Sequence, residues 1–360
     1  MKKAFGLGSF GCWLLLGFSG LAHADEDIPA YRVLTCEVKC PQRVEAKLLD
    51  PSRPAYPASE IPNAAEALVD VSYTIGTDGG TKGAMIEQLI GAQPFADAVL
   101  AAVAGRRYQP ATEDGKPVEQ NARIRFLFSV GGLSRFARGN TSSNYRAAIA
   151  LEQGGDAAGA VAALNAIEAK PDLNLYERTM VAFALAGAEV KAGDDAAALD
   201  AVRIATISGG SFLDYRTRER ALRLRIELEA QAGQPAEAFA WFQILEKTVT
   251  VAADDHEAQL VAQLHAAIDT PAPLAMVAAI PQLPHEAFWQ HTLLRRTFAF
   301  SQIQGKLDDF DLRCDQHGIE SPVSDKAEWN VPKSWTGCVL YVHGAAGTKF
   351  EFVELQPAAK

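Results

Sequence analysis

The stretch that decides the fold reads Asn121-Ala122-Arg123-Ile124-Arg125-Phe126-Leu127-Phe128-Ser129-Val130. Its apolar residues at 122, 124, 126, 128 and 130 alternate with mostly polar ones, which is the period of a strand with one buried face. The pattern predicts a long β-strand, and a free edge on such a strand can pair with another chain. The stretch therefore indicates recognition rather than catalysis.

The residues before this strand predict two further strands and a helix. Residues 68–75 alternate in the same way, and Thr77-Asp78-Gly79-Gly80 is a hairpin signal leading to a strand near residues 84–89. Gln93-Pro94 opens a helix with apolar residues every four positions, and Pro110 lies beyond its end. The side chains expected to face inward are Val69, Val71, Tyr73, Ile75, Phe95, Val99 and Val103. The segment from 54 to 133 is thus a small β-β-α-β domain.

Several motifs in this domain resemble those of the C-terminal domain of the energy transducer TonB family. They are Pro54-Ala55-Tyr56-Pro57 at the start, Asp78-Gly79 in the hairpin, Arg107-Tyr108-Gln109-Pro110 at the helix exit and Gly115-Lys116-Pro117-Val118 before the last strand. Arg106 stands where the family often has Trp, and Glu66-Ala67 replaces a common Gly. The resemblance covers about 77 of 360 residues.

The resemblance implies a non-enzymatic protein-protein interaction domain that needs no cofactor. In the family, the last strand receives an extended segment of an outer-membrane TonB-dependent transporter, and the pairing transmits force from an inner-membrane motor. We therefore expect a partner-binding edge formed by Arg123, Ile124, Arg125, Phe126, Leu127 and Phe128. Helices of the same chain, or a second copy in a homodimer, can instead cover this edge. Force transmission fits less well, because only residues 25–53 separate the first apolar run from the domain.

The first 24 residues are expected to be a secretory signal peptide, which would make the protein periplasmic. Lys2 and Lys3 precede an apolar run, and Ala22-His23-Ala24 before Asp25 fits a cleavage site. The alternative is an inner-membrane anchor over residues 4–24, since an uncharged run of ~20 residues can span a bilayer. Removal of the signal changes the net charge from −10 to −12. An acidic chain argues against nucleic acid and anionic lipid as partners.

Four of the five cysteines lie beyond the expected signal, and an even number in an exported protein indicates disulfides. The simplest pairing joins Cys36 to Cys40 in the N-terminal segment 25–53, and Cys314 to Cys338; two other connectivities stay open. His317 and His343 offer a zinc alternative with the second pair. We expect no metal, because thiols pair readily in an oxidising compartment.

The rest of the chain predicts a helical array and a β domain, which gives an α+β multidomain fold. Between 140 and 283, Gly155, Gly193 and Gly233 each start a similar Ala-rich segment, and the array resembles tetratricopeptide helix pairs. Prolines at 271–284 mark a boundary with short helical turns. Residues 285–360 predict a four-stranded antiparallel domain.

No catalytic motif occurs, so the functional alternatives both concern binding. The first is a periplasmic TonB-like protein that assists transport across the outer membrane by strand pairing. The second is an envelope scaffold whose helical repeats bind protein partners.

Overall fold

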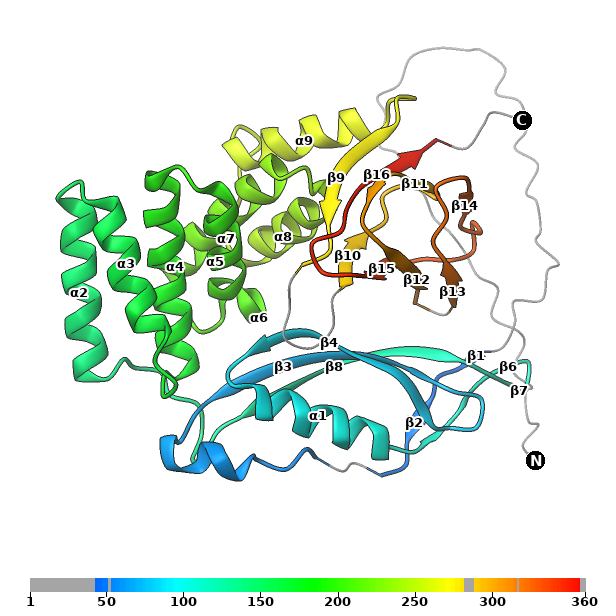
Figure 1. The fold of residues 1–360 in the computed structure, drawn as a ribbon, viewed down its shortest axis with the longest axis horizontal. Coiled ribbons are helices and arrows are strands. Elements are labelled where there is room, and N and C mark those ends of the chain that lie inside the picture. Colours follow the sequence, from blue (N-terminus) through cyan, green and yellow to red (C-terminus); the bar gives the residue numbers. More distant parts are fainter. Residues whose placement is uncertain (1–42, 51–52, 282–287, 316, 357–360) are drawn as a thin grey trace, which may run out of the picture. The chain divides into compact units, whose positions relative to one another are not determined.

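The computed structural model describes residues 43–50, 53–281, 288–315 and 317–356 (Figure 1). The expected signal peptide, the alternative anchor, Cys36 and Cys40 lie outside these residues. The described part has the predicted α+β composition, with a small sheet domain, a series of helices and a second β domain following one another. Within it, no helix has both the length and the apolar character needed to cross a membrane.

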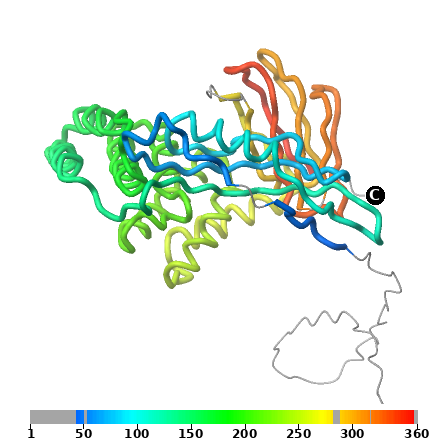
Figure 2. Tube along the Cα trace, turned by 90° about the horizontal axis from the view of Figure 1, so that it is seen from below, coloured from blue at the N-terminus to red at the C-terminus, as the bar shows by residue number. Residues whose placement is uncertain are grey.

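The first domain, called the module below, is built on a three-stranded antiparallel sheet with the order β4-β3-β8. Figure 2 shows its long strands side by side. Strand β3 lies in the centre and pairs with β8 over its whole length, with Val71 opposite Ile124. The elements are β1 (Arg43–Val44), β2 (Lys47–Leu48), η1 (Ala58–Asn63), β3 (Ala67–Ile75), β4 (Thr81–Ile90), α1 (Gln93–Gly105), β5 (Tyr108–Gln109), β6 (Ala111–Glu113), β7 (Lys116–Val118) and β8 (Gln120–Phe128).

Helix α1 covers one face of this sheet, as the alternation predicts. The expected inward side chains of β3 and α1 are all within 2% of complete burial. The opposite face of β3 differs from the expectation of a polar, solvated surface, because Asp70 and Ser72 are buried too. Leu68 on that face packs with Leu175 and Ile207 of the helical region. The central strand is therefore buried on both sides.

The helical array consists of hairpins that correspond to the sequence repeat. Gly155, Gly193 and Gly233 have φ values of +88°, +83° and +71° and lie between paired helices. The alanines five residues later, at 160, 198 and 238, are fully buried, so the second helix of each pair approaches its neighbour closely. The elements are α2 (Gly139–Gln153), α3 (Ala157–Glu168), α4 (Leu175–Ala192), α5 (Asp195–Ala205), α6 (Ile207–Gly210), α7 (Tyr215–Gln231), α8 (Pro235–Thr248) and α9 (His256–Ile268). Membership of the tetratricopeptide class stays a prediction.

The C-terminal domain is a β-sandwich of two four-stranded antiparallel sheets, ordered β10-β15-β12-β13 and β14-β11-β16-β9. The expected single four-stranded piece is wrong, because its four strands are divided between two sheets and shorter strands complete each one. Phenylalanines 298, 300, 310, 350 and 352 from both sheets form one buried core. The elements are β9 (Leu274–Ala279), β10 (Phe288–Thr292), β11 (Thr297–Gln304), β12 (Leu307–Arg313), β13 (Gly318–Pro322), β14 (Glu328–Asn330), β15 (Val339–Gly344) and β16 (Lys349–Leu355).

Strand β9 lies where short helical turns are expected between prolines. Its alternating Met276 and Ala278 pack on the sandwich core, and the segment pairs with β16. Val277, between them, is 83% exposed. The alternation of buried and exposed residues thus predicts this segment better than the prolines on either side of it.

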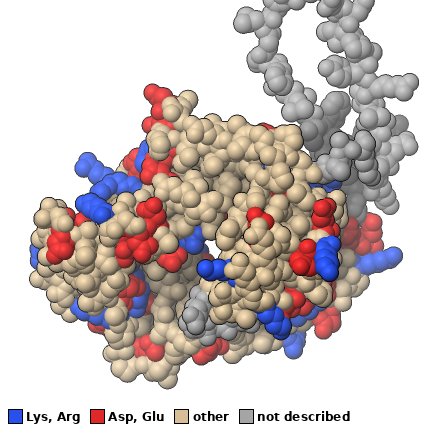
Figure 3. All heavy atoms as spheres, turned by 45° about the horizontal axis from the view of Figure 1, so that its top comes forward, with Lys and Arg blue, Asp and Glu red and all other residues tan. Residues whose placement is uncertain are grey.

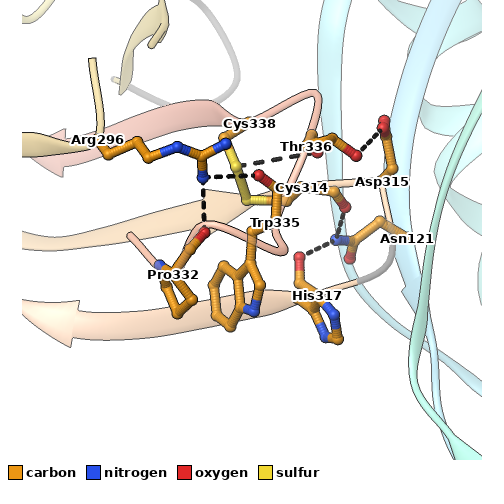
Figure 4. Close-up of a disulfide and its surroundings, with 9 residues drawn as sticks. All are labelled: Asn121, Arg296, Cys314, Asp315, His317, Pro332, Trp335, Thr336 and Cys338. Carbon is orange, nitrogen blue, oxygen red and sulfur yellow. Dashed lines mark hydrogen bonds between the residues drawn. A yellow bond between two sulfur atoms is a disulfide. The ribbon is translucent and has the colours of Figure 1, made fainter. Parts of the chain in front are cut away.

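A disulfide joins Cys314 to Cys338 in this domain (Figure 4). His317 stacks on Trp335, and His343 lies on β15 beside Phe288. Across the described ranges, no cluster of three or more His, Cys, Asp or Glu side chains could hold a metal ion. The two sulfurs are bonded to each other.

Candidate functional site

Strand β8 stands at the edge of the module's sheet. It pairs with β3 on one side, and within the described residues no hydrogen bond reaches its other backbone edge. An edge strand offers unpaired N–H and C=O groups to an incoming strand. Strand β8 thus has the free backbone edge that its alternating sequence suggested.

The apolar side chains of β8 belong mostly to the module's own core. Ile124 and Phe126 are half-buried against the cluster that contains α1. Phe128 is buried, and its ring lies 4.9 Å from that of Phe95. Leu127 points to the other face and is 49% exposed.

Arg125 turns across the sheet rather than outward. Its Nε and Nη2 donate to the two carboxylate oxygens of Asp70 at 2.7 Å each, and its Nη1 donates to Ser208 Oγ at 2.5 Å. The hydrogen bond to Asp70 raises the pKa of Arg125 against the opposing effect of burial. This guanidinium is therefore engaged in hydrogen bonds within the chain.

Arg123 is held in the same way by the sandwich and by β4. Its Nε lies 2.6 Å from Glu87 Oε2, and its Nη2 donates to Tyr341 Oη at 3.2 Å. Burial alone would lower the pKa of Arg123, but the charges of and hydrogen bonds to Glu87 and Tyr341 together outweigh it, and the pKa is raised. Tyr341 also donates to Glu87, which completes a triangle between three elements. Among the six side chains expected to bind a partner, Leu127 alone is both exposed and apolar, so the strand offers mainly its backbone.

The residues of the family motif hold the module together rather than lining an opening. Tyr56 Oη donates to the carbonyl of Ala65 at 2.5 Å, and its ring meets Phe95 edge-on. Pro57 precedes η1 as its N-cap residue, and Pro54 lies at the start of the same extended stretch. This segment therefore closes the open end of the sheet and helix.

The hairpin residue Gly79 explains why the Asp-Gly pair is needed. Its φ is +78°, and a Cβ there would lie 2.0 Å from the carbonyl oxygen of Tyr108. Asp78 Oδ1 accepts from Gly80 N at 2.9 Å, and Gly79 O accepts from Tyr108 N at 2.9 Å. The hairpin thus lies directly against the segment that follows helix α1, and only glycine can occupy position 79 at this contact.

Behind this contact, two buried tyrosines and an arginine form a hydrogen-bonded group. The hydroxyls of Tyr73 and Tyr108 are 2.5 Å apart, and Arg106 Nη1 donates to both. Burial, with the hydrogen bond to Tyr108, raises the pKa of Tyr73 to about 12. Arg106 also lies over the ring of Phe126 at 5.1 Å, where the family often has Trp. The cation is thus part of the module's buried core.

The polar face of the sheet is covered by the sandwich. Arg313 donates to Ser72 Oγ at 3.0 Å and to the carbonyl of Gly83 at 2.7 Å. Asn121 Nδ2 donates to the carbonyls of Cys314 and His317 beside the disulfide (Figure 4). No local pattern marks these residues, because their partners are 193 to 241 positions away in sequence.

Beyond β8, the linker 131–138 is fixed to the helices by two buried carboxylates. Glu66 accepts from Ser134 N at 2.6 Å and from Leu175 N at 3.0 Å. Glu177 accepts from Arg138 N at 2.7 Å and pairs with its guanidinium. The edge strand therefore continues into an ordered segment.

Charge is mixed on the surface. On the face drawn in Figure 3, basic and acidic side chains are interspersed, and no broad basic area stands out there. Nucleic-acid binding requires a concentrated basic face.

A three-stranded sheet with one helix on its core face and with β8 as an unpaired edge strand is a domain suited to strand addition. Residues 52–130 match the family model of the Gram-negative bacterial TonB protein C-terminal. The module is therefore a TonB C-terminal-type domain. The solution NMR structure of the Pseudomonas aeruginosa TonB CTD is 27% identical over 25% of this chain and 91% of that chain, with a TM-score of 0.23. Among curated proteins, none matches the chain.

Proposed function

We propose that this protein binds protein partners in the periplasm by strand pairing along the outer edge of β8, and so assists transport across the outer membrane. The observation that carries the proposal is the unpaired edge of β8 within a TonB C-terminal-type domain. Backbone pairing supplies affinity, and side chains at alternate positions supply selectivity. Periplasmic segments of TonB-dependent transporters are the proposed partners.

The surroundings of β8 support binding over catalysis. Most of its side chains are engaged in the core or in ion pairs, which fixes the strand so that little order must be gained when a partner binds. The described part of the helical array shows three scattered exposed apolar side chains, namely Leu151, Val190 and Tyr215. No observation there favours the array over β8 as the binding surface.

The test is binding of synthetic periplasmic segments of transporters to the whole chain and to the variant Ile124→Pro. Proline lacks the backbone donor and disturbs an edge, so binding should fall by at least about tenfold, equivalent to ~1.4 kcal/mol. Val277→Pro is the matched control, since it places proline in edge strand β9 of the sandwich. Circular dichroism and thermal unfolding report whether each variant is folded.

Unchanged binding by a folded Ile124→Pro variant would exclude pairing at this edge and leave the helical array as the binding surface. Equal losses in both variants would show a general effect of proline. Hydrogen exchange gives an independent readout, because a paired partner should protect amides of β8 and not those of β9.

A further inference from the structure

Large apolar side chains are concentrated just past the unpaired edge. Among the described residues, twelve large apolar side chains are exposed, and four of them fall within 127–136, namely Leu127, Val130, Leu133 and Phe136. Their exposed fractions are 49%, 51%, 36% and 83%. Single exposed apolar residues need no explanation, but four within ten residues of chain make this segment a candidate interaction site.

The backbone that carries these side chains is anchored. Ser134 N donates to Glu66, and the carbonyl of Phe136 accepts from Asn174 Nδ2 at 3.1 Å. Arg138 is tied to Glu177, which is completely buried. Leu133 and Phe136 are thus held in solvent by a fixed chain, although burial of such side chains would be stabilising.

The linker that carries these apolar side chains also lines a cleft and carries the exposed side chain of Arg135. The linker, Asn63 and Asn174 line a cleft of about 660 Å³. Arg135 is exposed on the linker and makes no ion pair or hydrogen bond with the described residues. Between β8 and the cleft lie Gly131 and Gly132, which have no side chain. The space that a Cβ would occupy at either position is open, with no other atom within 4 Å. A strand that pairs with β8 can therefore continue over this surface.

We infer that the surface formed by Leu127, Val130, Leu133, Arg135 and Phe136 docks an acidic, apolar extension of the segment that pairs with β8. This inference rests on the proposed function and specifies the partner's chemistry. The partner contributes large apolar side chains to the surface and the cleft, and a carboxylate to Arg135. A second copy of the chain fits poorly, because Leu127, Val130, Leu133 and Phe136 offer no carboxylate to Arg135 in a two-fold contact of this surface.

The experiment selects peptides from a random twelve-residue displayed library on the whole chain. Selected peptides should carry Asp or Glu next to large apolar residues. Their affinity should fall about tenfold in Phe136→Ser and about fivefold in Arg135→Glu, which correspond to ~1.4 and ~1 kcal/mol. The matched controls are Val277→Ser, which removes an equally exposed apolar side chain on β9, and Lys333→Glu, which reverses an exposed charge elsewhere. Both controls should bind like the native chain.

Hydrogen exchange separates the two proposals. Peptides that protect β8 but ignore both linker variants would overturn the docking surface while leaving strand pairing intact. Peptides that protect neither β8 nor the linker would overturn both. Light scattering and binding to phosphatidylethanolamine/phosphatidylglycerol vesicles complete the test. Self-association, or vesicle binding, that disappears in Phe136→Ser would assign the surface to a second copy or to lipid, and would overturn the peptide proposal.

Discussion

The module and the sandwich are both small antiparallel β domains, yet they complete their cores differently. The sandwich closes its aromatic core between its own two sheets and adds a disulfide. The module builds its core on one face of the three-stranded sheet β4-β3-β8, which α1 covers, while Leu175, Ile207 and Arg313 from later parts of the chain cover the other face. A domain of this kind keeps an accessible edge but depends on its neighbours for its second face. We therefore expect the sandwich to stay folded without the rest of the chain, and the module to lose stability without the helices and the sandwich.

The largest expected effect comes from emptying either core by the same substitution. Phe298→Ala in the sandwich and Phe95→Ala in the module each remove a completely buried ring. Each should lower the free energy of unfolding by ~3–5 kcal/mol. Because the module depends on the sandwich for part of its second face, hydrogen exchange for Phe298→Ala should increase in the sandwich and also at β3 and β4, which Arg313 contacts. For Phe95→Ala it should increase in the module and also at the contacts of Leu68. Identical exchange patterns would contradict the comparison.

The disulfide should stabilise the sandwich by roughly 3 kcal/mol, the chain-entropy value for a loop of this size. The double variant Cys314→Ala/Cys338→Ala tests this by denaturant unfolding. Because Asn121 of β8 donates to the carbonyl of Cys314, exchange at the start of β8 should also rise. A change confined to residues 314–338 would show that the module does not sense the bond.

Arg313→Met tests the cover over the module's polar face. The substitution leaves the acceptors on Ser72, Gly83 and Asp311 without their donor, and should lower stability by ~2 kcal/mol. Arg296→Met is the matched control, since Arg296 donates to the carbonyls of Pro332 and Trp335 within the sandwich. Amides of β3 and β4 should lose protection in Arg313→Met and keep it in the control.

The smallest effect concerns the tie between the module's exit and the helices. Burial would raise the pKa of Glu177, but hydrogen bonds from Arg138 and Asn174 outweigh it and the pKa lies below 4.5. A depressed pKa in the folded state means that the carboxylate stabilises above pH 4.5, and that the contribution disappears as pH falls through the folded value. Glu177→Gln should cost about 1.5 kcal/mol at pH 7.

Thermal unfolding between pH 7 and pH 3 measures this difference. The native chain and Glu177→Gln should converge in stability at the acid end. A constant difference across that range would exclude ionisation of Glu177 as its cause.

The sequence predicts what is local and misses what is distant. Val69, Val71 and Tyr73 face α1 as their alternation indicates, and Gly79 occupies the tight turn that Asp78-Gly79 predicts. The helical hairpins follow from their repeated glycines. The burial of Asp70 and Ser72 could not be predicted, because it depends on segments that lie more than 100 residues away. The local pattern also does not indicate that Arg123 pairs with Glu87 and Arg125 with Asp70, which lie 36 and 55 positions away.

Glu66 links the module to the part of the chain that follows it. Where the TonB family commonly has glycine, this buried carboxylate receives hydrogen bonds from the linker and from the first turn of α4. A terminal domain has no use for such an acceptor, since nothing follows it that needs anchoring. We therefore predict an acidic residue before the first strand in modules that a further domain follows, and a survey of related sequences checks this.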